Sequence, residues 1–247
     1  MQPMAYIKPA PLLLAALLTM NVTHATVGGD QYLEFLGYEP TDQKVYLLRY
    51  YMDGRARAPQ LYYFNLASNT PTKLVEVESI YRLPNGKIDI DQDPVNSEFG
   101  RQLTTIKNRL VPLIPLAKDS IRVNKLQTTQ KSVIAWYDDY EGKPDTEKAH
   151  IPEYQYRYRL TTGLANTDTY HNTCYQSMPQ MAISYRPQLL VKHAYAIPTQ
   201  RYVIAGIKYL ADQFEVGYYH EDPVVLSPKR QLSGTTLQDL ITCYWRY

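Results

Sequence analysis

The segment 153–160, EYQYRYRL, has the most regular spacing of chemically useful side chains in the chain. Two residue types alternate strictly along it, which is typical of a strand whose side chains point to opposite faces. One face carries Tyr154, Tyr156, Tyr158 and Leu160, and the other carries Gln155, Arg157 and Arg159.

Two binding modes follow from this alternation. With the tyrosines packed inward, the arginines face water and could grip a carboxylate or phosphate by paired hydrogen bonds. With the tyrosines outward, the rings form a stacking platform. An ordinary amphipathic strand with a solvated polar face is the alternative to both. The residues that we predict to bind a ligand or partner are Tyr154, Tyr156, Arg157, Tyr158 and Arg159.

Two further groups of side chains could take part in acid–base chemistry. The sequence His-Glu-Asp at 220–222 combines a base with two carboxylates, but neighbouring residues of a strand point apart. Asp138, Asp139 and Glu141 could supply the carboxylate pair that glycoside hydrolysis requires, and a solvated loop is the alternative.

Recognisable catalytic and metal-binding motifs are missing from the sequence. It has no G-x-S-x-G, no H-E-x-x-H and no glycine-rich phosphate loop. Asp89, Asp91 and Asp93 begin like a calcium loop, but Pro94 stands where glycine is needed and Gly100 where the closing glutamate should be. We therefore predict no cofactor, no metal site and no assignable catalytic residue.

The two cysteines, Cys174 and Cys243, predict one disulfide bond. Closing a loop of that length would stabilise the fold by about 4 kcal/mol in the chain-entropy model. A catalytic thiol or a metal-ligand pair is the alternative, and no second ligand pair completes a tetrahedral site beside His171 and Cys174.

Residues 1–25 have the composition of a signal peptide. Lys8 is the single positive charge, the apolar run 11–20 follows, and Thr23-His24-Ala25 resembles a small-residue cleavage site. The apolar run is shorter than the roughly 20 residues that span a bilayer. We predict cleavage after Ala25 and a soluble periplasmic or secreted protein formed by 26–247 as a single β-rich domain.

Charge and aromatic content narrow the class of partner. The whole chain has a formal net charge of +2, which gives no general attraction to nucleic acid or to a membrane surface. It contains 24 tyrosines and only 4 phenylalanines. Many rings are therefore expected to be half-buried with hydroxyls reaching water or a partner, as in proteins that bind glycans or other proteins. A sheet with a tyrosine-lined solvent face is the simpler explanation of the same composition.

Residues 32–66 predict the central sheet-forming unit, because runs of β-branched, aliphatic and aromatic residues alternate with turn residues. Helical spacing of apolar residues predicts helices at 96–110 and 236–246. Further strands are predicted at 73–83, 132–137, 153–161, 188–196, 201–210 and 214–220. The fold class is therefore mostly β, with antiparallel sheets arranged as a sandwich or a propeller-like meander, and with one or two helices.

The sequence favours an exported, non-catalytic binding or interaction protein that engages a protein or a cell-envelope polymer. An inhibitor or immunity-type protein that plugs an enzyme's cleft is one form of this hypothesis. The alternative is a hydrolase that acts on an envelope polysaccharide or peptidoglycan through paired carboxylates. A cleft with two carboxyl groups about 5–10 Å apart would favour the hydrolase, and a flat or convex aromatic patch would favour binding.

Overall fold

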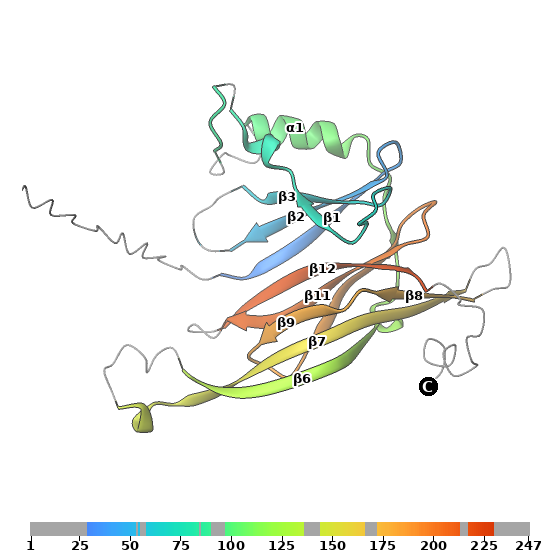
Figure 1. Ribbon diagram of the computed structural model, residues 1–247. Helices are drawn as coiled ribbons and strands as arrows, with labels where there is room; N and C mark the ends of the chain where they lie inside the picture. The colour runs from blue at the N-terminus through green and yellow to red at the C-terminus, as the bar shows by residue number, and fades with distance from the viewer. Residues whose placement is uncertain are drawn as a thin grey trace, which may run out of the picture.

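The chain folds into two antiparallel β-sheets covered on one side by a helix (Figure 1). The computed structural model describes residues 29–52, 54, 58–83, 85–89, 97–135, 144–165, 172–212 and 217–229. The protein is mostly β, as predicted from the sequence. The predicted signal peptide, the predicted C-terminal helix and the loop that contains Asp138, Asp139 and Glu141 lie outside the described residues.

The first sheet has the order β1-β2-β3-β4 and confirms the sheet-forming unit predicted at 32–66. Its strands are β1 (Gln31–Glu39), β2 (Lys44–Tyr51), β3 (Gln60–Asn65) and β4 (Leu74–Glu76). Both faces of β2 are buried, because Val45 and Leu47 contact the second sheet while Tyr46 and Leu48 contact the helical layer. The predicted strand 73–83 is shorter than expected, since β4 is followed by the 3-10 turn η1 (Glu78–Tyr81).

Helix α1 (Glu98–Lys107) covers the outer face of the first sheet (Figure 1). It begins at Ser97, whose side chain accepts a hydrogen bond from the Gly100 N–H at 3.3 Å, as a helix N-cap does. Phe99 and Leu103 point inward, and the Phe99 ring stacks on Tyr81 of η1 with centroids 5.4 Å apart. The helix predicted at 96–110 is therefore confirmed.

The second sheet is the larger one and has the order β5-β10-β11-β12-β8-β7-β6, with β9 paired to β7. Its strands are β5 (Ile114–Pro115), β6 (Arg122–Ile134), β7 (His150–Ala165), β8 (Asn172–Ser177), β9 (Gln180–Ser184), β10 (Leu190–Ala196), β11 (Val203–Asp212) and β12 (Tyr218–Pro228). Short 3-10 turns η2 (Lys118–Ser120) and η3 (Asp145–Glu147) precede β6 and β7.

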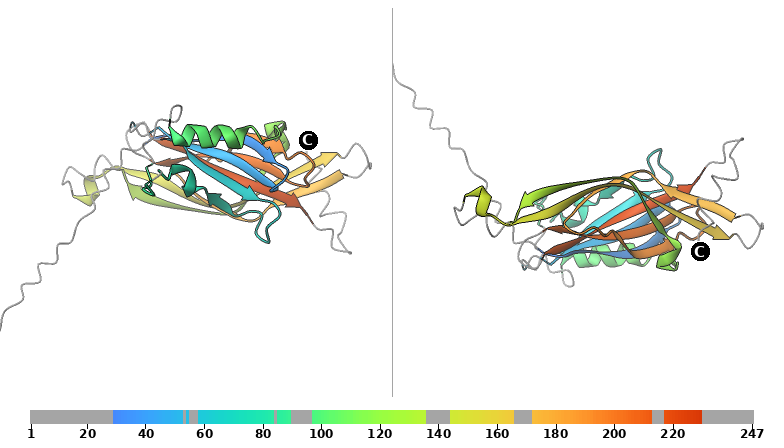
Figure 2. Two further views of the ribbon diagram at one scale, coloured as in Figure 1. Left: turned by 90° about the horizontal axis from the view of Figure 1, so that it is seen from above. Right: turned by 90° about the horizontal axis from the view of Figure 1, so that it is seen from below.

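Strands β11 and β12 form the middle layer of the molecule, so both of their faces are buried. Ile204 and Val225 pack against the first sheet. Val203 and Val224, one residue away on each strand, point to the opposite side and pack against the part of the second sheet that contains β7. The views from above and below show α1 over one side of these layers and β6 with β7 over the other (Figure 2). This is a sandwich, not a propeller-like meander.

The cysteine pair cannot be judged from the described residues. Cys174 lies in β8 and is buried, whereas Cys243 lies outside them. The Cys174–Cys243 disulfide therefore remains a prediction. None of the helices in the described ranges has the length and apolar character that crossing a membrane would require.

Candidate functional site

Strand β7 places the predicted tyrosine–arginine segment with its tyrosines inward. It pairs with β6 along one edge and with β9 and then β8 along the other. Tyr156 and Tyr158 are buried in the core between the two halves of the second sheet, and the half-buried Tyr154 stacks on Tyr156 at 6.0 Å. The tyrosines therefore form no outward stacking platform.

The opposite face of β7 carries the basic row, as expected for inward tyrosines. Arg157 is exposed, whereas Gln155 and Arg159 are half-buried. Across the strand pair, Arg157 lies opposite Met181 of β9. Among the described residues, no hydrogen bond or ion pair engages the Arg157 guanidinium group. Binding of a ligand or partner by this face stays a prediction.

The same face of β7 also contains a buried carboxylate that the sequence did not single out. Glu153 accepts hydrogen bonds from Lys131 at 2.9 Å and from Gln155 at 3.1 Å, and Tyr185 donates to it at 3.3 Å. Burial opposes ionisation of Glu153, but these donors outweigh it and hold its pKa below the usual value. Glu153 is therefore an anion that ties β6 and β7 to Tyr185, the residue that follows β9.

A groove of about 460 Å³ lies between β9 and the strands β11 and β12, and we call it the β9 groove. Its lining consists of Gln155, Met181, Ala182, Ile183, Tyr209, Ala211 and His220. Two apolar side chains at its border are unusually open to solvent, because Met181 is 79% exposed and Ile183 is 49% exposed. A mostly apolar groove with a few polar groups is the usual form of a binding site.

His220 is the titratable group of the β9 groove. The Gln31 side-chain amide donates to His220 Nε2 at 2.9 Å, which leaves the ring proton of the neutral imidazole on Nδ1. Burial lowers the pKa of His220, although Asp222 nearby raises it in part. His220 is therefore uncharged at neutral pH, as suits a mostly apolar groove.

Asp222 points to the same side of β12 as His220 and joins the two sheets. The Tyr209 hydroxyl donates to it at 2.6 Å, and Arg49 of β2 donates at 3.2 Å. Burial, followed by the Asp222 charge, raises the pKa of Tyr209. With its two oxygens occupied by these donors, Asp222 has a structural role.

Glu221 points to the other side of β12, into a second hollow of about 310 Å³ that we call the β12 hollow. Its carboxylate oxygen Oε2 accepts the Leu33 N–H at 3.0 Å and lies 3.3 Å from His193 Nε2. Burial opposes the ionisation of Glu221, but the hydrogen bonds from His193 and Leu33 outweigh it and lower its pKa. Lys192 and Lys208 also line this hollow.

Two local features bring His193 to Glu221. The register of β10 and β11 slips between Val191 and His193, so Lys192 is the extra residue of a β-bulge. Gly206 lies opposite His193, and a Cβ atom there would come within 2.9 Å of the imidazole Cδ2. The ring can occupy this position only because residue 206 has no side chain.

The sequence foresaw part of this arrangement. It predicted that adjacent residues of 220–222 point apart, and the structure confirms this. The contact between His193 and Glu221 was missed, because the two residues lie on non-adjacent strands and no local pattern links them. Within the described ranges, no cluster of three or more metal-ligating side chains occurs. Of the three aspartates at 89–93, only Asp89 belongs to those ranges.

Comparisons of the chain with protein-family models, with curated proteins and with solved structures found no match. The function must therefore be inferred from the chemistry of the residues around β7, β9 and β12.

Proposed function

We propose that this protein is an exported, non-catalytic interaction protein that binds a protein partner through the surface formed by β7 and β9. The observation that carries this proposal is the exposed pair Met181 and Ile183 beside Arg157, at the border of the β9 groove. Exposed apolar side chains that gather at one place mark interaction surfaces more often than scattered ones do.

The chemistry of this surface suits a protein partner better than a carbohydrate polymer. An apolar or aromatic side chain of the partner would enter the β9 groove and be desolvated by Met181 and Ile183, as the anchor residues of interfaces are. Arg157 would then pair with a carboxylate at the rim, where an arginine fork forms two parallel hydrogen bonds. A polysaccharide would instead call for exposed aromatic rings, and the β7 tyrosines point inward.

The hydrolase alternative receives less support. A glycosidase of the common type needs one carboxylic acid whose pKa is raised so that it can donate a proton. The buried carboxylate of the β12 hollow, Glu221, has a lowered pKa instead. It is ionised at neutral pH and suited to holding His193 and binding cations, not to protonating a leaving group.

The test is a cross-linking pull-down from an envelope extract of the native cell, with the captured protein identified by mass spectrometry. The test variants are the pair Met181→Ser with Ile183→Ser and the single change Arg157→Ala. Leu190→Ser is the matched control, because Leu190 is 51% exposed on β10 and lies outside the β9 groove. Exposed substitutions of this kind change stability by no more than about 0.5 kcal/mol.

We expect the wild type and Leu190→Ser to capture the same partner, and both test variants to lose it. A partner that is retained by both test variants would move the interaction surface elsewhere. Turnover of an envelope polymer by the purified protein would refute the non-catalytic proposal. Export is tested separately, since intact-mass analysis should show a mature chain that begins at Thr26, and a full-length cytoplasmic species would contradict it.

A further inference from the structure

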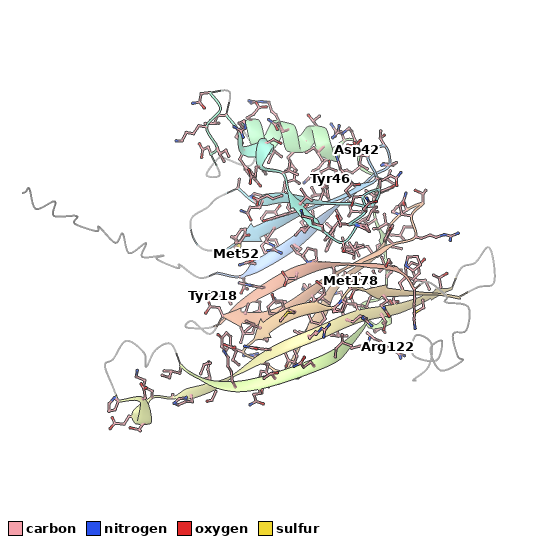
Figure 3. All side chains as sticks on the ribbon, in the orientation of Figure 1. Asp42, Tyr46, Met52, Arg122, Met178 and Tyr218 are labelled. Atoms are coloured by element: carbon pink, nitrogen blue, oxygen red, sulfur yellow. The ribbon has the colours of Figure 1, made fainter. Side chains whose placement is uncertain are left out.

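The β12 hollow contains two positive and two negative side chains around a small space. It opens between the start of β1 and the strands β10, β11 and β12, and its charged lining consists of Asp30, Lys192, Lys208 and Glu221. Met52 and Tyr218, at the ends of β2 and β12, lie at the same end of the two sheets (Figure 3). The hollow is distinct from the β9 groove, which lies on the other face of β12.

Glu221 is the charged group at the floor of the hollow. Only 2% of its side chain is exposed, yet it belongs to the lining. Oxygen Oε2 is engaged by His193 and by the Leu33 N–H, whereas no described residue donates a hydrogen bond to Oε1. Oε1 therefore keeps its capacity to accept a hydrogen bond, and a carboxylate oxygen forms a strong, charge-assisted hydrogen bond with an ammonium group.

The two lysines are delivered by the strands that flank Glu221. Lys208 is the cross-strand neighbour of Glu221, and its Nζ lies 4.5 Å from the centre of the Tyr219 ring. Lys192 is the extra residue of the β10 bulge, which turns it toward the same hollow as His193. β-Bulges often re-aim side chains beside functional sites in this way.

An apolar side completes the hollow. The exposed Met52 and the buried Leu33 belong to its lining and supply apolar surface. The ring of Tyr32 is directed away from the hollow, because it stacks on Tyr50 on the side of the first sheet that packs against the helical layer. The hollow therefore offers an anionic floor, cationic groups and an apolar side.

We propose that the β12 hollow binds a free amino acid with an apolar side chain. Its ammonium group contacts Glu221, its carboxylate contacts Lys192 and Lys208, and its side chain lies against Leu33 and Met52. A simple anion would meet the charges of Glu221 and Asp30, and a simple cation would meet the two lysines. A zwitterion matches both sets of charges at once.

Isothermal titration calorimetry tests this proposal with three probes that differ in one group each. L-Phenylalanine carries both charges, 3-phenylpropionate lacks the ammonium group, and 2-phenylethylamine lacks the carboxylate. We expect binding of L-phenylalanine and, for each analogue, an affinity weaker by about tenfold or more, since each loses a charged contact. Equal affinity for all three probes, or no heat from any proteinogenic amino acid at millimolar concentration, would overturn the proposal.

Variants then locate the site. Glu221→Gln and Lys208→Gln should each weaken L-phenylalanine binding by about tenfold, whereas Lys118→Gln, on η2 outside the hollow, should leave it unchanged. Lys208 is only half-buried, so Lys208→Gln is the variant that decides the test if Glu221→Gln proves unstable. L-Phenylalanine affinity that is unchanged in Lys208→Gln would place the ligand elsewhere and refute the assignment.

Discussion

Replacing Glu221 with leucine should lower the free energy of unfolding by about 2–4 kcal/mol. Leucine has a similar volume but accepts no hydrogen bond, so the N–H of the buried residue Leu33 would lose its acceptor. Leaving one buried N–H without a partner costs about 1–3 kcal/mol. Losing the contact with His193 adds about 1 kcal/mol, because the partly exposed imidazole can turn to water.

Glu221→Gln separates the two contributions. The glutamine carbonyl can still accept the Leu33 N–H, so this variant should lose only about 1 kcal/mol. Urea unfolding followed by far-ultraviolet circular dichroism gives both values at pH 7. If Glu221→Leu unfolds within about 0.5 kcal/mol of the wild type, the hydrogen bond to Leu33 contributes nothing and the reasoning is wrong.

Acid provides a second check of the same reasoning. The pKa of Glu221 is lower in the folded protein than the unfolded value of about 4.3. The ionised carboxylate therefore stabilises the fold above that value, and this contribution is lost as the pH falls through the folded pKa. The difference between the wild type and Glu221→Leu should be constant from pH 7 to about 5 and shrink below about pH 4. A difference that grows on acidification would refute the assignment of charge.

Three further predictions concern other parts of the fold. The pKa of His220 is lowered in the folded protein, so the unfolded chain takes up a proton first as the pH falls below about 6.5, and the wild type loses stability there. Urea unfolding between pH 7 and 5 should therefore show a smaller loss of stability for His220→Gln than for the wild type. Gly37→Ala should cost about 1–3 kcal/mol by thermal or urea unfolding, because Gly37 has a φ of +149° and a Cβ would lie 2.8 Å from the Val111 carbonyl oxygen. Reduction should lower the melting temperature if Cys174 and Cys243 are bonded, and two titrating thiols in the oxidised, denatured protein would contradict the bond.

The sequence predicted best those strands whose own residues prefer the extended state. β2, β10 and β11 are rich in aliphatic and aromatic residues. β10 and β11 are found within about two residues of their predicted ranges, and β2 lies inside the unit predicted at 32–66. Helix α1 was predicted because Phe99 and Leu103 follow the helical period and Ser97 caps the first turn.

Strands that depend on a tertiary partner were not predicted. Most of β6 is polar and exposed, so residues 122–131 have no hydrophobic alternation, and they are extended because β7 pairs with them over their whole length. Strand β9 has only five residues, and it pairs with β7 along the same edge that β8 occupies further on. Pairing energy from distant residues decided these elements, not local preference.

The same reason explains which parts of the candidate sites were visible in advance. The alternation of β7 and of 220–222 is a local property, so both sets of faces could be predicted. The bulge at Lys192 and the space beside Gly206 arise only when β10 and β11 are in register. The contact of His193 with Glu221 then requires β12 as a third strand, because His193 and Glu221 flank β11 on opposite sides.

The alternation of β12 also keeps the two proposals independent. His220 belongs to the lining of the β9 groove and Glu221 to that of the β12 hollow, so a change of one side chain leaves the other lining intact. Gln31 is the exception, because it lines the β12 hollow while its amide holds His220. Glu221→Gln should therefore leave partner capture unchanged, and Met181→Ser should leave amino-acid binding unchanged, whereas Gln31→Ala is the single change expected to affect both.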